Sequence, residues 1–179
     1  DLFHEEIPDS YIEQVFEVMA DLPQHRFQVL TKRPEQAADW DWWPDNVWMG
    51  TSVEKARYSH RIEALSECAA QTRFVSFEPL LGPIGYVAPS HNDWAIVGGE
   101  SHPDEDERRE MDHAWARDIR DQCRRDDVAF FFKQSSGPRT EMGTKLIEAD
   151  GSRTEYTEFP DEVHEFAQTT SGQQAISDF

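Results

Sequence analysis

Short apolar runs recur along the chain, and each one stops abruptly at polar side chains. We expect strands at residues 26–31, 47–52, 73–77, 93–97 and 128–133. Between these runs, apolar residues recur at helical spacing, which predicts helices at residues 8–22, 34–39, 55–70 and 112–125. Strands that alternate with helices in this way predict an α/β fold with a parallel sheet and right-handed crossover helices.

The residues that follow the expected strands are candidates for chemistry. Ligands of parallel sheets bind outside the carboxyl ends of the strands, where polar side chains from several strands meet. A carboxylate there can act as a general base or accept a hydrogen bond from a ligand hydroxyl, and a lysine can meet a phosphate or carboxylate. The alternative is a structural network of ion pairs that closes one end of a barrel. The candidate catalytic residues are Lys32, Glu54, Glu78, Glu100 and Lys133.

Small and hydroxyl-bearing residues at the same strand ends are candidates for contacts with a cofactor. A pair of glycines lets backbone N–H groups approach a ligand closely, because no Cβ atom intervenes. The candidate cofactor-binding residues are Thr51, Ser52, Ser76, Gly98, Gly99 and Ser101. Three other polar side chains are candidate ligand contacts, namely His4, Arg33 and Gln134. The six tryptophans are expected to pack in the core and loops rather than to stack on bases.

The pattern changes after Gly137. Two short strand-like segments, 146–149 and 154–157, flank Asp150-Gly151, which predicts a β-hairpin. Beyond Pro160 we expect a flexible polar tail. The chain is therefore expected to contain a partial α/β barrel domain at residues 1–136, followed by a hairpin and tail at residues 137–179. Five strands are too few for an eight-stranded barrel, so the barrel would be incomplete.

The charge balance is strongly acidic, with 36 Asp and Glu against 17 Lys and Arg and a net charge of -19. Such a surface repels nucleic acid unless a local basic patch opposes it. The simplest interpretation is a solvated acidic coat suited to high salt, as in a halophilic host. An acidic mimic of nucleic acid is an alternative that rests on charge alone.

Cysteine use and hydropathy indicate a cytoplasmic protein without a metal site. Cys68 and Cys123 are far apart and form no CxxC motif, so we expect buried free thiols in a reducing compartment. No apolar run approaches the roughly 18 residues that span a membrane. The chain begins at Asp1 without Met, and we interpret residues 1–4 as the end of a strand. A missing N-terminal segment or a partner chain is then expected to cover the edge of the sheet.

Six motifs in order resemble a known family. They are LTKRPE at 30–35, VWMGTSVE at 47–54, RFVSFEPLLGPI at 73–84, WAIVGGES at 94–101, RDQC at 120–123 and VAFFFKQ at 128–134. Together they resemble the phage gp-thirty-seven/gp-sixty-eight-like family, a phage- and prophage-associated domain of unknown function. That family is similar to radical S-adenosylmethionine enzymes of the spore photoproduct lyase kind. The resemblance covers residues 1 to 135.

The resemblance implies an incomplete TIM-type barrel of the radical S-adenosylmethionine kind. For the full-length family it implies S-adenosylmethionine and an iron–sulfur cluster as cofactors. The cysteine-rich cluster motif of the family lies upstream of the Asp-Leu-Phe-His segment and is absent from this chain, so no cofactor is assigned to the chain itself. Two functions stay open. One is the C-terminal part of a radical S-adenosylmethionine-like enzyme that acts on a small molecule or nucleic acid. The other is a catalytically inactive remnant that binds a nucleotide or protein partner.

Overall fold

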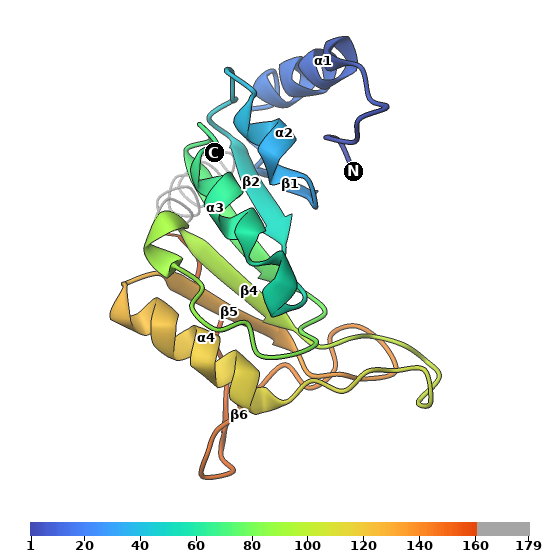
Figure 1. Cartoon of the computed structure of the whole chain (residues 1–179), viewed down its shortest axis with the longest axis vertical. Coiled ribbons are helices and arrows are strands. Elements are labelled where there is room, and N and C mark those ends of the chain that lie inside the picture. Colours follow the sequence, from blue (N-terminus) through green and yellow to red (C-terminus); the bar gives the residue numbers. More distant parts are fainter. Residues whose placement is uncertain (161–179) are drawn as a thin grey trace, which may run out of the picture.

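The fold consists of a parallel sheet, its crossover helices and a small hairpin (Figure 1). The computed structural model describes residues 1–160, so the tail predicted beyond Pro160 lies outside the described residues. The helices are α1 (Asp9–Ala20), α2 (Pro34–Ala38), α3 (His60–Ser66) and α4 (His113–Arg125), with short 3-10 turns at Ala56–Tyr58 and Pro89–His91. The strands are β1 (Phe27–Thr31), β2 (Val47–Ser52), β3 (Thr72–Phe77), β4 (Trp94–Gly98), β5 (Ala129–Gln134), β6 (Leu146–Ile147) and β7 (Arg153–Thr154).

The main sheet has five strands in the order β1-β2-β3-β4-β5, and every neighbouring pair is parallel. Each crossover therefore moves one position along the sheet, and α2, α3 and α4 lie on the same side of it (Figure 1). The predicted α/β class with a parallel sheet is confirmed. Because all strands are parallel, their carboxyl ends lie at one end of the sheet.

Two of the expected elements are wrong. The helix expected at residues 55–70 is a 3-10 turn followed by the short helix α3, which ends at Ser66. Cys68 lies just beyond the helix and packs in the core, where its thiol lies 3.7 Å from the carbonyl oxygen of Ala37. Residues 1–4 form a turn rather than the end of a strand. The Asp1 carboxylate accepts a hydrogen bond from the Phe3 N–H (3.2 Å), a local bond that competes with extended structure.

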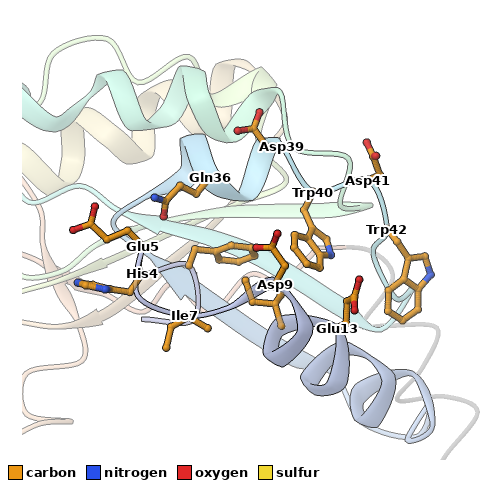
Figure 2. Close-up of a pocket in the computed structure, with 12 residues that line it drawn as sticks. His4, Glu5, Ile7, Asp9, Glu13, Gln36, Asp39, Trp40, Asp41 and Trp42 are labelled. Carbon is orange, nitrogen blue, oxygen red and sulfur yellow. The ribbon is translucent and has the colours of Figure 1, made fainter.

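The N-terminal segment and α1 pack on the tryptophan-rich loop after α2. Phe16 of α1 is fully buried, and its ring lies 5.1 Å from the Trp43 ring and 6.0 Å from the Trp40 ring, centroid to centroid. Trp42 lies beside α1 with its side chain toward solvent (Figure 2). The tryptophans therefore pack as expected, with Trp42 as the exposed member of this group.

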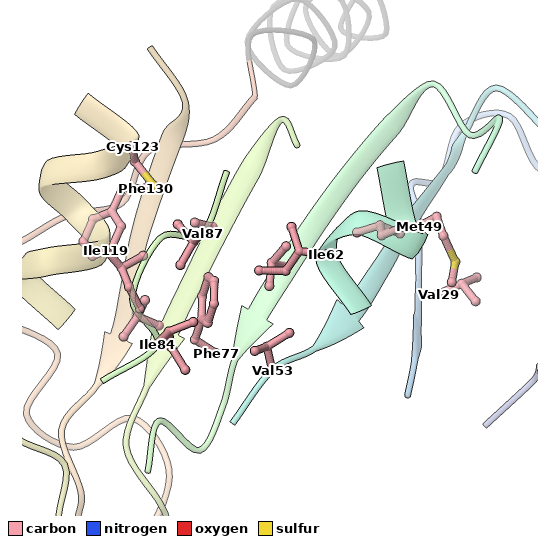
Figure 3. Packing of buried hydrophobic residues seen from close by; sticks show 14 of the residues in the cluster. Val29, Met49, Val53, Ile62, Phe77, Ile84, Val87, Ile119, Cys123 and Phe130 are labelled. Carbon is pink, nitrogen blue, oxygen red and sulfur yellow. The ribbon is translucent and has the colours of Figure 1, made fainter. Parts of the chain in front are cut away.

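Alternate strand residues form apolar layers on both faces of the sheet. The main core lies under the helices, and Val29, Met49, Phe77 and Phe130 are among its members (Figure 3). The opposite face carries a second cluster of Trp48, Phe74, Trp94 and Ile96. A sheet that is apolar on both faces is typical of parallel α/β proteins.

The segment after β7 returns to the sheet and lies along the edge of β5. Thr157 forms an antiparallel bridge with Phe131, and the ring of Phe159 lies 5.1 Å from the ring of Trp94. This segment therefore covers part of the second apolar cluster and occupies part of the free edge of β5.

The predicted C-terminal hairpin is confirmed, because β6 and β7 pair in antiparallel fashion. A buried polar network joins it to α4. Arg120 pairs with Glu148 at 2.6 Å, and the Tyr156 hydroxyl donates to the same carboxylate at 2.7 Å. Among residues 1–160, no helix is both long and apolar enough to cross a membrane.

Candidate functional site

The carboxyl end of the sheet gathers small residues on the face opposite the helices. Ser52 and Ser76 are register partners on β2 and β3. They lie two residues beyond Gly50 and Phe74, so they point to the same face as the second apolar cluster. On β4 the register partner of Ser76 is Ile96, and Gly98 ends the strand two residues further along. Ser52 and Ser76 have short side chains, whereas the space beside Gly98 is occupied by the Glu78 carboxylate.

Glu54 follows β2 and is held by two cations. Its carboxylate lies 2.6 Å from the Lys32 ammonium and 3.5 Å from the Arg61 guanidinium. Burial of the carboxyl opposes ionisation, but the hydrogen bond from Lys32 and the charges of Lys32 and Arg61 outweigh it and lower the pKa of Glu54. Glu54 is therefore an ionised acceptor at neutral pH. Arg61 lies within ion-pair distance of Oε2, yet this buried oxygen accepts no hydrogen bond from residues 1–160.

Glu78 follows β3 and lies at the centre of the site. Its carboxylate is 3.1 Å from the Lys133 ammonium and accepts a hydrogen bond from the Ser76 hydroxyl at 3.2 Å. Gly98 makes this position possible, because a Cβ atom at residue 98 would lie 2.4 Å from Glu78 Oε1. The loop after Glu78 is tied across the neighbouring strands, where the Leu80 N–H donates to the Gly98 carbonyl at 2.9 Å.

Glu100 follows β4 and pairs with Arg109, a residue of the acidic loop after the strand. The backbone N–H of Arg109 also donates to the Glu100 carboxylate at 2.8 Å. These hydrogen bonds from Arg109 lower the pKa of Glu100 to about 2. The sequence analysis did not select Arg61 or Arg109 as site residues. The sequence offered one indication of a role for these two arginines, namely that cations are rare in this acidic chain.

The three ion pairs share one arrangement, in which the carboxylate is the more buried partner. The exposed fractions of the side chains are 10% for Glu54 against 58% for Lys32, and 20% for Glu78 against 43% for Lys133. For the third pair they are 17% for Glu100 against 57% for Arg109. The strand ends therefore present cations to solvent and keep their carboxylates beneath, although the chain as a whole is acidic.

The other predicted site residues lie in several different surroundings. Thr51 is fully buried on the helix-covered face, where its hydroxyl donates to the Thr31 carbonyl at 2.9 Å. Gln134 is buried and donates to the Gly99 carbonyl at 3.0 Å and to the Ser101 hydroxyl at 2.5 Å. The structure thus joins Gln134, Gly99 and Ser101 in one hydrogen-bonded group below the charged layer.

Arg33 and His4 were predicted as ligand contacts, but neither is a partner in the three strand-end ion pairs. Arg33 pairs with the Asp1 carboxylate at 3.2 Å, and this carboxylate also accepts from the Thr31 hydroxyl at 2.6 Å. His4 lines a separate cavity of about 630 Å³ beside α1 (Figure 2). A second cavity, of about 470 Å³, lies against α4 at residues 83–86 and 115–125. Neither cavity is lined by residues of the three strand-end ion pairs.

The residues present do not fit an iron–sulfur cluster. In the part of the chain that the structure describes, no three His, Cys, Asp or Glu side chains lie together as a metal site. Cys68 and Cys123 are both buried, and burial raises the pKa of the Cys123 thiol to about 12. A thiol with this pKa stays protonated at neutral pH and is a poor metal ligand.

The fold and the site define the class of protein. It is a parallel α/β protein with three ion pairs at the carboxyl ends of its strands, whose cations face solvent. The chain belongs to the family described as protein of unknown function (DUF5131), whose model matches residues 1–170. Comparisons with curated proteins and with solved structures gave no match.

Proposed function

We propose that the carboxyl end of the sheet binds an anionic group of a small-molecule ligand. The observation that carries the proposal is the shared arrangement of the three ion pairs, in which Lys32, Lys133 and Arg109 face solvent and their carboxylates lie beneath. Each cation is held in place by its partner, so little side-chain entropy remains to be lost when a ligand binds. The buried carboxylates can also accept hydrogen bonds from amino or hydroxyl groups of the same ligand.

The proposal includes an incomplete TIM-type barrel of the radical S-adenosylmethionine kind. Parallel strands in strict chain order, with the crossover helices on one side, are the arrangement that a barrel requires. The aromatic cluster on the opposite face would then line the barrel interior. The strand ends would form the wall that faces the ligand.

S-adenosylmethionine is the ligand that fits this wall in the proposal. Its carboxylate suits the ammonium groups of Lys32 and Lys133, and its amino group suits the carboxylate of Glu54 or Glu78. The short side chains at Ser52 and Ser76 would leave space for the rest of the molecule. Because the described residues do not fit a cluster, the chain is assigned ligand binding alone and no radical step.

A second candidate function is a binding protein without catalysis, which takes a nucleotide or a protein partner. The pKa directions favour binding over acid catalysis at the strand ends, since Glu54 and Glu100 both have lowered pKa values. Neither carboxyl is then a proton donor at neutral pH, as general acid catalysis would require. The exposed cations would hold phosphate groups equally well, which keeps nucleic acid among the proposed ligands.

Isothermal titration calorimetry at low salt tests the proposal with three probes: S-adenosylmethionine, adenosine monophosphate and a short single-stranded DNA. We expect Lys32→Met and Lys133→Met each to weaken binding about 10-fold, since a hydrogen bond to a charged group contributes about 1.5–3 kcal/mol. The matched control is Lys145→Met, because Lys145 is exposed and is not a partner in any of the three strand-end ion pairs.

The outcomes separate the two candidates. If S-adenosylmethionine is the only probe that binds, and the two strand-end substitutions weaken its binding, the result supports the first candidate, in which the strand ends bind S-adenosylmethionine. Binding of only the phosphate probes with the same sensitivity supports the second candidate. If no probe binds, or if Lys145→Met weakens binding as much as Lys133→Met, the strand ends are not an anion site.

A further inference from the structure

The cavity beside α1 has the size of a small-molecule site. Its volume is about 630 Å³, within the range of about 300–1,000 Å³ that is usual for ligand pockets. His4, Glu5 and Asp9 come from the N-terminal segment and the start of α1, whereas Gln36, Asp39 and Trp40 come from α2 and the loop that follows (Figure 2). The cavity is therefore separate from the strand-end site.

Aromatic rings line this cavity. Phe3, Trp40 and Trp42 all contribute, and 46% of the Trp42 surface is exposed to solvent. The Trp42 ring is supported from behind by Phe16, whose ring centroid lies 6.1 Å away at an interplanar angle of 63°. The indole is thus held in place while much of its surface stays open. Aromatic side chains are common in the lining of ligand pockets.

The charged groups around the cavity are all acidic except for one histidine. No Lys or Arg lines it, and none of its carboxylates forms an ion pair with another side chain of residues 1–160. At the strand ends Glu54, Glu78 and Glu100 each have a cationic partner. The two regions therefore differ in whether their carboxylates are neutralised by a neighbouring cation. The unpaired carboxylates of the cavity are Glu5, Asp9, Glu13, Asp39 and Asp41.

The spacing of these carboxylates argues against an inorganic cation. A metal ion needs several oxygen ligands that converge on one point. In the part of the chain that the structure describes, no three acidic or histidine side chains lie together in this way. The carboxylates instead surround the cavity, and they lower the free energy of a cation anywhere within it. A large cation with diffuse charge gains from this field and also from contact with the ring faces.

We infer that the cavity between α1 and the α2 loop binds an organic cation of the quaternary ammonium class. The methyl groups of such a cation lie on the indole faces of Trp40 and Trp42, where the ring quadrupole attracts the positive charge. The surrounding carboxylates supply the rest of the attraction without direct coordination. This site differs in place and in ligand charge from the strand-end site.

Choline is the probe that tests the inference, because it is small and carries a quaternary ammonium group. Its binding to the full chain is followed by NMR titration, with sodium chloride replaced by choline chloride at constant ionic strength. A neutral probe of the same shape, 3,3-dimethyl-1-butanol, isolates the contribution of charge. We expect saturable binding of choline and at least about 10-fold weaker binding of the neutral probe, as a desolvated cation–π contact implies.

Two substitutions and two controls complete the experiment. Trp42→Leu keeps an apolar side chain but removes the ring face, and we expect about 10-fold weaker choline binding. Asp41→Asn removes one exposed carboxylate without a change of shape, and we expect a decrease of about 2- to 5-fold. The controls are Tyr86→Leu, an exposed aromatic residue at the other cavity, and Glu155→Gln, an exposed carboxylate near the hairpin. Neither should change choline binding.

Several results would overturn the inference. One is that choline shows no saturable binding when it replaces sodium at constant ionic strength. Another is equal affinity for the neutral probe, which would indicate an apolar pocket without charge selectivity. Unchanged binding in both Trp42→Leu and Asp41→Asn would place choline elsewhere. If Trp42→Leu does not fold, Asp41→Asn and the neutral probe decide the question.

Discussion

Gly98→Ala is the substitution that tests the strand-end site most directly. The new Cβ atom would lie 2.4 Å from Glu78 Oε1 and 3.1 Å from the Glu78 carboxyl carbon. Ordinary contact begins at 3.4 Å, so the carboxylate must move by at least 3.4 − 2.4 = 1.0 Å. Lys133 lies 3.1 Å from the same oxygen, so a movement of 1.0 Å directly away from Lys133 would lengthen the pair to 3.1 + 1.0 = 4.1 Å, beyond the 4.0 Å limit of an ion pair.

The effect on stability should be small and the effect on binding large. The Lys133 side chain is 43% exposed, and partly exposed ion pairs contribute about 0.2–1 kcal/mol. For a chain of this size, we therefore expect the Tm to fall by no more than about 4 °C. Affinity for the anionic ligand should fall about 10-fold, because Lys133 and Glu78 leave their positions together.

The assay combines a thermal melt with calorimetry on each variant. Gly82→Ala is the matched control, because a Cβ atom at residue 82 would meet no heavy atom within 4 Å. In a Glu78→Ala background the clash is removed, so Gly98→Ala should have almost no further effect on affinity. Unchanged affinity in the single variant would refute the assignment of Glu78 to the site. A fall in Tm of more than about 10 °C would show that Gly98 is required for folding instead.

Three other predictions concern stability. Burial of the His113 ring, with Arg117 nearby, lowers its pKa below 6.5, so the unfolded chain binds a proton more readily and stability should fall as pH drops from 7.5 to 5.5. Urea denaturation should show a weaker pH dependence for His113→Gln, and an equal dependence would contradict the assignment. Gly50→Ala should destabilise the fold by about 1–3 kcal/mol, because its Cβ atom would lie 2.3 Å from the buried Phe74 ring; a Tm within 1 °C of wild type would exclude this. With a net charge of -19, the Tm should rise toward 1 M salt, where the screening length is about 3 Å, whereas affinity for the anionic ligand should fall. A Tm that is flat or falling with salt would refute the high-salt interpretation of the acidic surface.

The amino-acid sequence alone determined the class of fold and the positions where strands end. An apolar run that stops at Lys32, Glu54 or Glu78 is a local signal, and it needs no knowledge of distant residues. The hairpin at Asp150-Gly151 is also local, since turn chemistry sets its position. Helix length was less certain. Residues 67–70 have a helical pattern, but α3 ends at Ser66 and the chain leads from there to β3, which begins at Thr72.

Only the tertiary structure decided how the charged residues pair and which way they face. The sequence left Lys32 free to pair with Glu54 or Glu78, and the neighbouring positions of β1 and β2 select Glu54. Thr51 faces the helices while Ser52 faces the opposite side, because side chains alternate along a strand and both faces of this sheet are apolar. The partners Arg61 and Arg109 lie outside the strands, so their contacts depend on how α3 and the acidic loop pack against the sheet. Glu78 and Lys133 are 55 residues apart, and the closer pairs of Glu54 with Arg61 and Glu100 with Arg109 follow no helix or strand periodicity, so no local pattern encodes these contacts.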